Sequence, residues 1–256
     1  MYLREIHAER DIPTLHQFIK ENPLGLLITG LDSKTAQFLQ SSHIPWVLDT
    51  PDGKDEMNFG TLRGHIARAN PQAKAFTETA KGASASEINP DGSYTLTRDV
   101  LVIFNGPAHH YVTPKFYTET KPATGKVVPT WNYSAVQAYG RATVFYDPKA
   151  ESTHKFLDKQ IRDLTNHNEV EIMGHKENSW VVEDAPGPYI KVLKSAILGV
   201  QIEISDIGGK WKMSQEVPVG DQEGVANGFA NLNTEVGAEM AKTVRLRCKK
   251  KEANTS

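Results

Sequence analysis

Residues 100–140 constrain the fold more than any other stretch of the chain. The segment opens with five consecutive strand-forming apolar residues, Val100–Phe104, and breaks at Asn105–Pro107. Two adjacent histidines follow, and after a polar loop the chain becomes ordered again in a run that contains Trp131–Tyr133. A chain that needed only a core would have little reason to place so many polar, stackable side chains beside its strongest strand. We therefore interpret this segment as one wall of a ligand site.

Alternation of apolar and polar residues predicts further short strands through the middle of the chain. In residues 60–69, Leu62 and Ile66 alternate with Arg63 and His65, so this strand has one face with cationic groups. The same reasoning places strands at 24–31, at 35–48 with a bend at 41–42, and at 94–105, 137–147 and 197–204.

Helices are expected mainly outside this strand-rich region. One-sided apolar stripes and capping residues place them at 11–22, 71–76, 148–168, 189–194 and 231–244. Residues 50–58 are predicted to form a polar loop, and 80–93 are the least ordered internal segment by composition. Strands and helices do not alternate as a doubly wound parallel sheet requires. We therefore expect an α+β protein built on an antiparallel barrel with peripheral helices.

Composition disfavours several classes of function. The formal net charge of −2 argues against a protein that mainly neutralises DNA phosphates, and the lysine-rich end is better interpreted as a solvated tail. The single cysteine, Cys248, rules out an intrachain disulfide and favours a reducing compartment. The first residues do not resemble a secretory signal, and no apolar run approaches the ~20 residues needed to span a bilayer. These features predict a cytoplasmic or nuclear protein without a membrane partner.

Several familiar catalytic motifs are missing from the sequence. It contains no GxGxxG after a strand, no GxxxxGK(S/T), no HExxH, no CxxC and no GxSxG. Rossmann-type dinucleotide binding, P-loop nucleotide hydrolysis, zinc peptidase chemistry and serine hydrolase chemistry are therefore disfavoured. The candidate chemistry that remains lies in three clusters of polar side chains and in one pair of histidines.

The first cluster, called the arginine cluster below, follows the predicted strand at 60–69. Its members are Arg63, His65, Arg68 and Asn70. A guanidinium group can grip a phosphate at two points, and a second cation nearby shares the charge of the dianion. The alternative is a solvated strand face with salt bridges, and this alternative is preferred when the cluster is considered alone.

Two further clusters each combine a cation, an indole and an amide. The Trp131 cluster comprises Lys126, Thr130, Trp131, Asn132 and Tyr133, and the Trp211 cluster comprises Lys210, Trp211, Lys212, Ser214 and Gln215. Aromatic rings can stack on a planar heterocycle, while amides bind its carbonyls and ring nitrogens. A core tryptophan under a loop explains the Trp131 cluster equally well, and a hairpin tip explains the Trp211 cluster.

The adjacent histidines, His109 and His110, are ambiguous. Neighbouring residues on a strand point to opposite faces, so the two side chains are not expected to bind one metal ion together. A histidine that faces a pocket could donate a proton or act as an axial ligand to haem. For each histidine taken separately, a polar loop position is the simpler interpretation.

Three phrases in the chain carry a family resemblance. They are GTLRGHIARANPQ at 60–72, GKVVPTWNYSAVQAYG at 125–140 and GKWKMSQ at 209–215. In these phrases, their order and their spacing, the chain resembles the PaiB family of FMN-binding negative transcriptional regulators. The similarity runs from the N-terminus to about Asn227, and GPAHHYVTPKFYTETKP is similar to the family's GPHAYISPSWY region, with its histidines arranged differently.

The resemblance implies a split β-barrel like that of the pyridoxamine-phosphate-oxidase-like flavoproteins. It would span residues 1–227, and residues 228–256 would form a C-terminal helix and basic tail. Such proteins are usually homodimers with FMN at the subunit interface, and some relatives of this barrel bind haem.

The resemblance also implies roles for individual residues. The implied cofactor-binding residues are Arg63, Arg68, Asn70, Lys126, Trp131, Asn132, Lys210, Trp211, Lys212, Ser214 and Gln215. Both arginines and Lys126 would steady the phosphate of FMN, either tryptophan would flank the isoalloxazine, and the amides and Ser214 would bond its polar edge. His65 or His110 could supply a proton, and His109 or His110 would be the axial ligand if haem is bound.

The favoured hypothesis is a flavin- or haem-dependent oxidoreductase that acts on a small organic molecule, with the cofactor carrying the redox chemistry. One alternative is a regulator in which cofactor occupancy controls a partner or DNA. Another is a flavin-binding module without catalysis, because barrels of this kind host both enzymes and silent binders.

Overall fold

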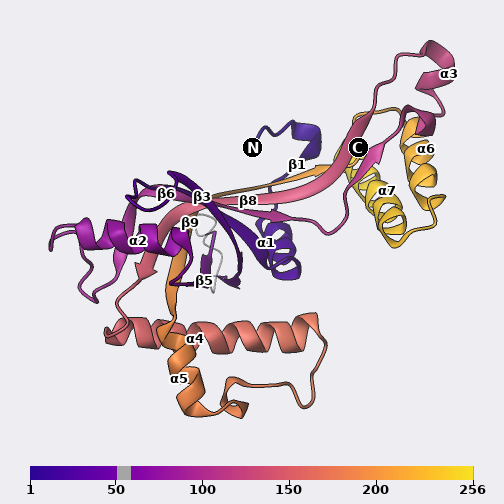
Figure 1. Ribbon diagram of the computed structural model, residues 1–256. Helices are drawn as coiled ribbons and strands as arrows, with labels where there is room; N and C mark the ends of the chain where they lie inside the picture. The colour runs from indigo at the N-terminus through magenta and orange to yellow at the C-terminus, as the bar shows by residue number, and fades with distance from the viewer. Residues whose placement is uncertain (51–58, 256) are drawn as a thin grey trace. The chain divides into compact units, whose positions relative to one another are not determined.

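The computed structural model describes residues 1–50 and 59–255 (Figure 1). Most of the predicted polar loop at 50–58 therefore lies outside the described residues. The chain forms two compact units. Unit 1 comprises Met1–Leu15, Asn105–Val136 and Gly208–Ser256, and unit 2 comprises His16–Phe104 and Gln137–Ile207. Each unit is thus assembled from segments far apart in sequence, and the long strands β8 (Thr130–Phe145) and β9 (Ile197–Lys212) contribute residues to both.

The strands form a sheet with antiparallel pairing. Within the described residues its order is β3-β2-β6-β8-β9-β5-β4, with β1 added to β9 and β7 to β8. The remaining strands are β1 (Ala8–Glu9), β2 (Leu24–Gly30), β3 (Leu39–Pro45), β4 (Val47–Asp49), β5 (Thr61–Ala67), β6 (Tyr94–Asn105) and β7 (His110–Val112). β2 pairs antiparallel with β3 and β6, and β5 pairs antiparallel with β4 and β9. The α+β class is confirmed, and the described pairings form an open order that ends at β3 and β4.

Helices lie between and after the strands. They are α1 (Ile12–Glu21), α2 (Pro71–Gly82), α3 (Thr120–Thr124), α4 (Glu151–His167), α5 (Gly187–Ser195), α6 (Val219–Ala230) and α7 (Glu235–Thr255), with short helical turns at Glu5–His7, Pro114–Phe116, Asn168–Ile172 and Val182–Asp184. The amphipathic patterns at 11–22 and 148–168 predicted α1 and α4 to within a few residues, and the short helix predicted at 189–194 lies within α5.

The segment before β3 differs from the sequence prediction. The predicted strand at 35–39 is wrong for residues 35–38, because Ser33 and Thr35 donate hydrogen bonds of 2.8 and 2.7 Å to the Glu78 carboxylate of α2 and so hold this segment out of the sheet. Only Leu39 belongs to β3. β3 then runs without a bend through Ser41, which pairs with Ile28. α2 also extends beyond the predicted end at residue 76.

The C-terminal region holds two helices where the sequence predicted one. α6 was missed because its glycines weaken helix propensity. Two of its three glycines, Gly224 and Gly228, are required by packing against Phe116 within unit 1. A Cβ at Gly224 would come within 2.3 Å of the Phe116 carbonyl oxygen, and one at Gly228 within 2.3 Å of the Phe116 ring. The helical conformation is interrupted between α6 and α7 near Asn233, which has a left-handed φ of 53°.

Candidate functional site

Arg63 is buried in unit 2 and held by acidic side chains. The apolar face of β5, with Leu62 and Ile66, is buried as expected, but Arg63 on the opposite face is also buried and only 4% exposed. Its Nη2 donates to Asp49 Oδ1 at 2.7 Å and to Asp163 Oδ2 at 2.6 Å, its Nε donates to Asp49, and its Nη1 donates to Gln160 Oε1 at 3.3 Å. Burial lowers the pKa of Arg63, but the hydrogen bonds that Arg63 donates to the Asp49 and Asp163 carboxylates outweigh this and raise it. All three guanidinium nitrogens are therefore bonded to protein acceptors.

The other members of the arginine cluster also lie in unit 2. Asn70 caps α2 by accepting from the Gln72 amide at 2.9 Å, and its Nδ2 donates to Ser42 Oγ at 3.0 Å. The Nε of Arg68 donates to the Ser195 carbonyl at 3.1 Å. Within the part of the chain that the structure describes, Arg68 Nη2 and His65 Nδ1 are buried without a hydrogen-bond partner, and burial lowers the pKa of both side chains.

The Trp131 and Trp211 clusters come together in unit 1, although about 80 residues separate them in the chain. Asn132 Nδ2 donates to Ser214 Oγ at 3.0 Å, and both residues are almost fully buried. The ammonium of Lys212 donates to the Trp131 carbonyl at 3.0 Å and to the Thr130 hydroxyl. These contacts tie the first residues of β8 to the turn that follows β9.

Residues 211–215 comprise the last two residues of β9 and the turn that follows them, and this segment, called the turn at 211–215 below, is closed by its own side chains. Gln215 Nε2 donates to the Trp211 carbonyl at 2.6 Å, and Gln215 Oε1 accepts from the Met213 amide at 2.7 Å. Ser214 has a φ of 63°, in the left-handed region that residues other than glycine rarely adopt. The buried amide of Gln215 therefore stabilises a strained turn whose serine reaches Asn132.

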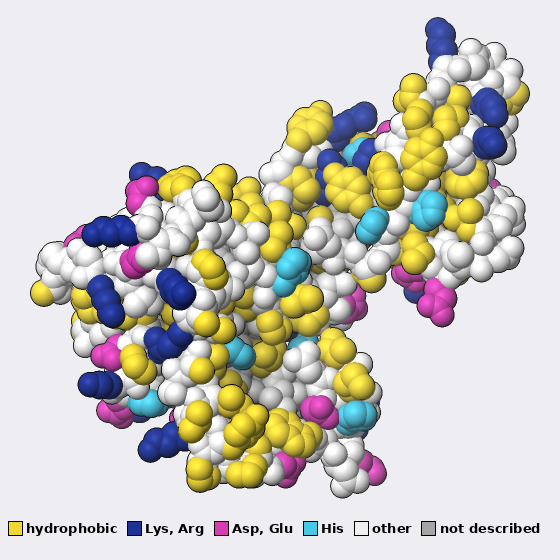
Figure 2. Space-filling model, viewed as in Figure 1, with side chains coloured by type: hydrophobic (Ala, Val, Ile, Leu, Met, Phe, Trp, Pro, Cys, Tyr) yellow, Lys and Arg dark blue, Asp and Glu magenta, His cyan; other side chains and the backbone are white. Residues whose placement is uncertain are grey.

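A hollow of about 520 Å³ lies beside these contacts within unit 1. Its lining residues are Asn105, Gly106, Pro107, His109, Trp131, Tyr133 and Ser134. Trp131 is 53% exposed, and its ring centre lies 5.8 Å from that of His109. Figure 2 shows hydrophobic and histidine side chains gathered on the surface of this part of the molecule. Residues 100–140 thus provide the wall of a hollow, and an exposed indole, that of Trp131, forms part of this wall.

The two histidines lie in different surroundings. His109 lines the hollow, whereas His110 is not among its described lining residues. The His110 ring packs edge-on against Phe229 at 5.5 Å, and its Nδ1 lies 2.8 Å from the Tyr111 carbonyl. In the β7–β8 pairing, His110 is opposite Asn132 and Tyr111 is opposite Trp131. His109 is therefore the histidine placed to contact a ligand in this hollow.

The cations of unit 1 differ in how firmly they are held. Lys210 is 9% exposed, and its Nζ donates to the Tyr2 carbonyl at 3.1 Å and lies 5.5 Å from the Tyr133 ring centre. Burial lowers the pKa of Lys212, although Glu216 opposes the shift. Lys126 lies exposed between α3 and β8.

Sequence reasoning missed a partly buried acid, Glu216, beside the Trp211 cluster. Glu216 Oε2 lies 2.9 Å from His7 Nε2, and Lys212 Nζ lies 3.8 Å from its other oxygen. Burial opposes ionisation of Glu216, but the hydrogen bond with His7 and the nearby Lys212 ammonium lower its pKa from 4.5 to about 2. No motif indicated this contact, because 209 positions separate His7 from Glu216.

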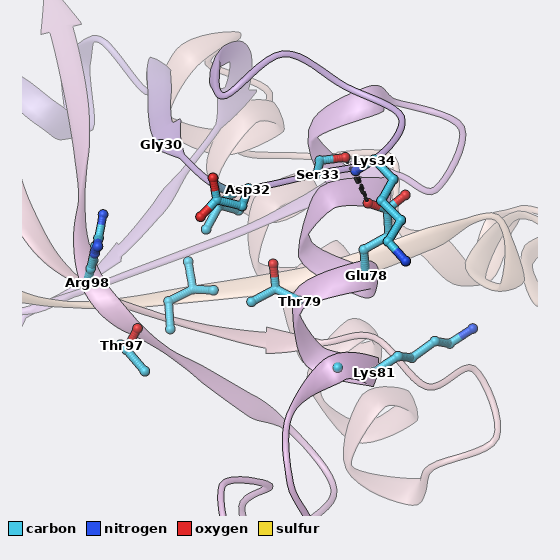
Figure 3. Close-up of a pocket in the computed structure, with 12 residues that line it drawn as sticks. Gly30, Asp32, Ser33, Lys34, Glu78, Thr79, Lys81, Thr97 and Arg98 are labelled. Atoms are coloured by element: carbon cyan, nitrogen blue, oxygen red, sulfur yellow. Dashed lines mark hydrogen bonds between the residues drawn. The ribbon is translucent and has the colours of Figure 1, made fainter.

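A second hollow, of about 820 Å³, lies in unit 2 (Figure 3). It lies among the turn after β2, the last turns of α2, and β6. Glu78 shapes one side by accepting from Ser33 Oγ and from the Lys34 amide at 3.1 Å. Figure 3 shows Arg98 on the β6 side and Lys81 extending away from the other lining side chains. The lining cations thus do not converge on one point, and the described residues that line this hollow include none of the predicted site residues.

Residues 1–206 match the family model described as "Putative FMN-binding domain". The chain belongs to this family. An uncharacterised protein of Aspergillus fumigatus is 54% identical over 256 residues, covering 96% of this chain and 97% of that protein. The Bacillus subtilis "Protease synthase and sporulation protein PAI 2" is 28% identical over 254 residues, covering 98% and 99%. The solved structure of the flavocytochrome Anf3 from Azotobacter vinelandii matches with a TM-score of 0.43 and 12% identity, over 82% of this chain and 72% of that one.

The family assignment rests on the sequence matches, and it agrees with the resemblance in the three phrases. Among the helices of the described residues, none has the length and apolar character needed to cross a membrane.

Proposed function

We propose that this protein binds FMN in the hollow of unit 1 and acts as a flavin-dependent oxidoreductase on a small organic molecule. The observation that supports the site is the half-exposed Trp131 indole on the wall of a 520 Å³ hollow, in a member of an FMN-binding family. Ligand sites are typically about 300–1,000 Å³ and lined by aromatic groups with a few polar atoms, and the hollow fits this description. The proposal includes closure of the sheet as a split barrel and association as a homodimer.

Each residue around the hollow has a proposed task. The Trp131 indole stacks on the isoalloxazine, and the nearby His109 ring offers a nitrogen to its polar edge. The side chains of Asn132 and Ser214 are hydrogen-bonded to each other, so in this proposal they fix the position of Trp131 and do not contact the ligand. Bound FMN supplies the redox chemistry, and the protein supplies position and electrostatics.

The phosphate of FMN requires a cation. Within unit 1, Lys126 is exposed and Lys212 is bonded to the Trp131 carbonyl, so we propose these two lysines as the source of positive charge. Arg63 is already balanced by two carboxylates, so its phosphate contact is the least supported part of the expected set.

The visible absorption spectrum of the purified protein tests the cofactor. Flavin bands support FMN, a Soret band supports haem with His109 as the candidate ligand, and a colourless protein that takes up neither would overturn the proposal. Stacking on one aromatic side chain contributes about 1–3 kcal/mol, so Trp131→Ala is expected to weaken FMN binding by roughly 5- to 150-fold. Trp180→Ala is the matched control, because Trp180 is also exposed, at 45%, but belongs to unit 2. Equal affinities in the two variants would exclude the Trp131 stack.

Catalysis needs a separate measurement. The FMN-loaded protein is mixed with NADH or NADPH under anaerobic conditions, and bleaching of the flavin bands is followed. Bleaching supports an oxidoreductase. A flavin that stays oxidised with every reductant tested would overturn the oxidoreductase proposal and favour a flavin-binding protein without catalysis.

A regulatory role is the second candidate, supported by the similarity over 98% of the chain to the Bacillus protein named for protease synthesis and sporulation. The net charge of −2 argues against strong direct contact with DNA phosphates. A gel-shift assay at low salt, with and without FMN, tests this role, and no shift under either condition would end its DNA-binding version.

A further inference from the structure

The C-terminal helix α7 is part of unit 1, although it lies beyond residues 1–206, which match the family model. Met240, Val244 and Cys248 recur every four residues and are all buried, so one stripe of the helix faces the interior of unit 1. Cys248 Sγ lies 3.9 Å from the Met213 carbonyl, which places this stripe against the turn at 211–215.

Arg247 makes the most specific contact of α7. Its Nη1 donates to Glu9 Oε2 at 2.6 Å, and its guanidinium carbon lies 4.0 Å from the ring centre of Trp211. The side chains of Arg247 and Glu9 are only 12% and 7% exposed. A guanidinium over an indole face is a favourable cation–π geometry, and its strength grows when the pair is shielded from water.

Trp211 transmits this contact to the turn. Its carbonyl accepts from Gln215, and Gln215 in turn holds the Met213 amide. Between them, Ser214 has a φ of 63°, a conformation that persists only when its surroundings enforce it. Ser214 then bonds to Asn132, the neighbour of Trp131 on β8. A continuous set of contacts therefore leads from Arg247 to the strand residues beside the hollow.

We propose that α7 is a positioning element of the flavin site, with Arg247 as the positioning residue. It holds Trp211 and the turn at 211–215 so that Ser214 fixes Asn132 and, through it, the Trp131 indole. The ligand class is FMN, so this inference rests on the proposed function. Arg247 itself does not contact the ligand in this proposal.

The test compares two arginines on the same helix. Arg247→Gln removes the cation over Trp211, whereas Arg245→Gln removes an arginine that is 40% exposed and bonded to Glu223 and Asn227. The affinity for FMN is measured by quenching of flavin fluorescence, and folding is checked by far-UV circular dichroism. Arg247→Gln is expected to weaken FMN binding by at least ~10-fold, with Arg245→Gln within ~2-fold of the wild type.

Two further variants separate positioning from general stability. Arg247→Lys keeps a cation near the indole and is expected to recover affinity to within ~3-fold of the wild type. Glu9→Gln combined with Arg247→Met removes the ion pair without leaving a buried charge alone, so it is expected to fold and still to bind FMN at least ~10-fold more weakly.

The outcomes distinguish this inference from the proposed function. If the wild type does not bind FMN, the proposed function fails and this inference fails with it. If the wild type binds FMN and the folded Arg247→Gln or double variant binds it equally well, only the role of α7 is overturned. Recovery of FMN affinity in Arg247→Lys supports a role for the cation over Trp211. If Arg247→Lys binds FMN as weakly as Arg247→Gln does, that role is overturned.

Discussion

Replacing Arg63 with methionine distinguishes a structural role for this residue from a role in binding the phosphate of FMN. Methionine fills much of the same volume but carries no charge. Breaking a fully buried ion pair costs about 3–5 kcal/mol, because a charge is left without a partner. In Arg63→Met the carboxylates that lose their guanidinium partner are those of Asp49 and Asp163. Their side chains are 44% and 34% exposed, so hydration offsets part of the cost. We expect the free energy of unfolding at pH 7 to fall by about 2–3 kcal/mol.

The assay is urea unfolding followed by far-UV circular dichroism, with FMN affinity measured on the same preparations. Arg141→Met is the control, because the Arg141–Asp99 pair lies in the same unit but both partners are more than half exposed, and its loss is expected to cost less than about 1 kcal/mol. A normal urea midpoint in Arg63→Met, together with a tenfold or greater loss of FMN affinity, would refute the structural role and support the phosphate contact.

The cost of Arg63→Met should also depend on pH. Burial raises the pKa of Asp163, but hydrogen bonds from Lys159 and Arg63 outweigh this and lower it below its usual value. The stabilisation is present above the pKa of the unfolded carboxyl group and is lost as the pH falls through the folded-state pKa. The difference in urea midpoint between the wild type and Arg63→Met is therefore expected to shrink in acid.

Three further predictions concern unit 1. The pKa of Glu216 is about 2 in the folded state and 4.5 in the unfolded chain. Its ionised form therefore stabilises the fold by roughly 3 kcal/mol above pH 4.5, and this stabilisation is lost as the pH falls from 4.5 to 2. Glu216→Gln should accordingly lower the urea midpoint at pH 7 far more than at pH 3. Equal differences at the two pH values would contradict this linkage. Gly228→Ala should cost about 1–3 kcal/mol by overpacking, measured as a lower melting temperature, whereas Gly82→Ala, where a Cβ meets nothing within 4 Å, should show no such loss. Ser214→Ala loses the hydroxyl and keeps the left-handed strain, so it should be about 1 kcal/mol less stable than Ser214→Gly, and the reverse order in urea unfolding would show that this φ carries no strain.

Local periodicity predicted most of the elements whose partners lie nearby in sequence or whose faces are uniformly buried. β5 and α4 follow their patterns because Leu62 faces the core and α4 has a one-sided apolar stripe. α6 could not be predicted in this way. Its glycines count against a helix until Phe116, over 100 residues earlier, is known to pack against them.

The candidate site shows the same limit. Trp131 and the Trp211 cluster were identified from residue type and from the family resemblance, but the Asn132–Ser214 hydrogen bond joins positions 82 residues apart. The acidic partners of Arg63 lie on β4 and α4, and nothing in the spacing of the arginine cluster indicates them. Residue chemistry can suggest what a cluster could bind, whereas only the tertiary arrangement shows which charges are already neutralised.

The register of β7 against β8 has a consequence for how members of this family can diverge. Tyr111 is paired with Trp131 by strand hydrogen bonding, and 17 residues from Thr113 to Pro129 connect the two strands. Doubling the length of such a connection costs only about 0.6 kcal/mol in chain entropy, and it does not shift the pairing. Insertions and deletions are therefore tolerated best at the exposed residues 121–126, where they would leave both the packing of Phe116 against α6 and the place of Trp131 unchanged.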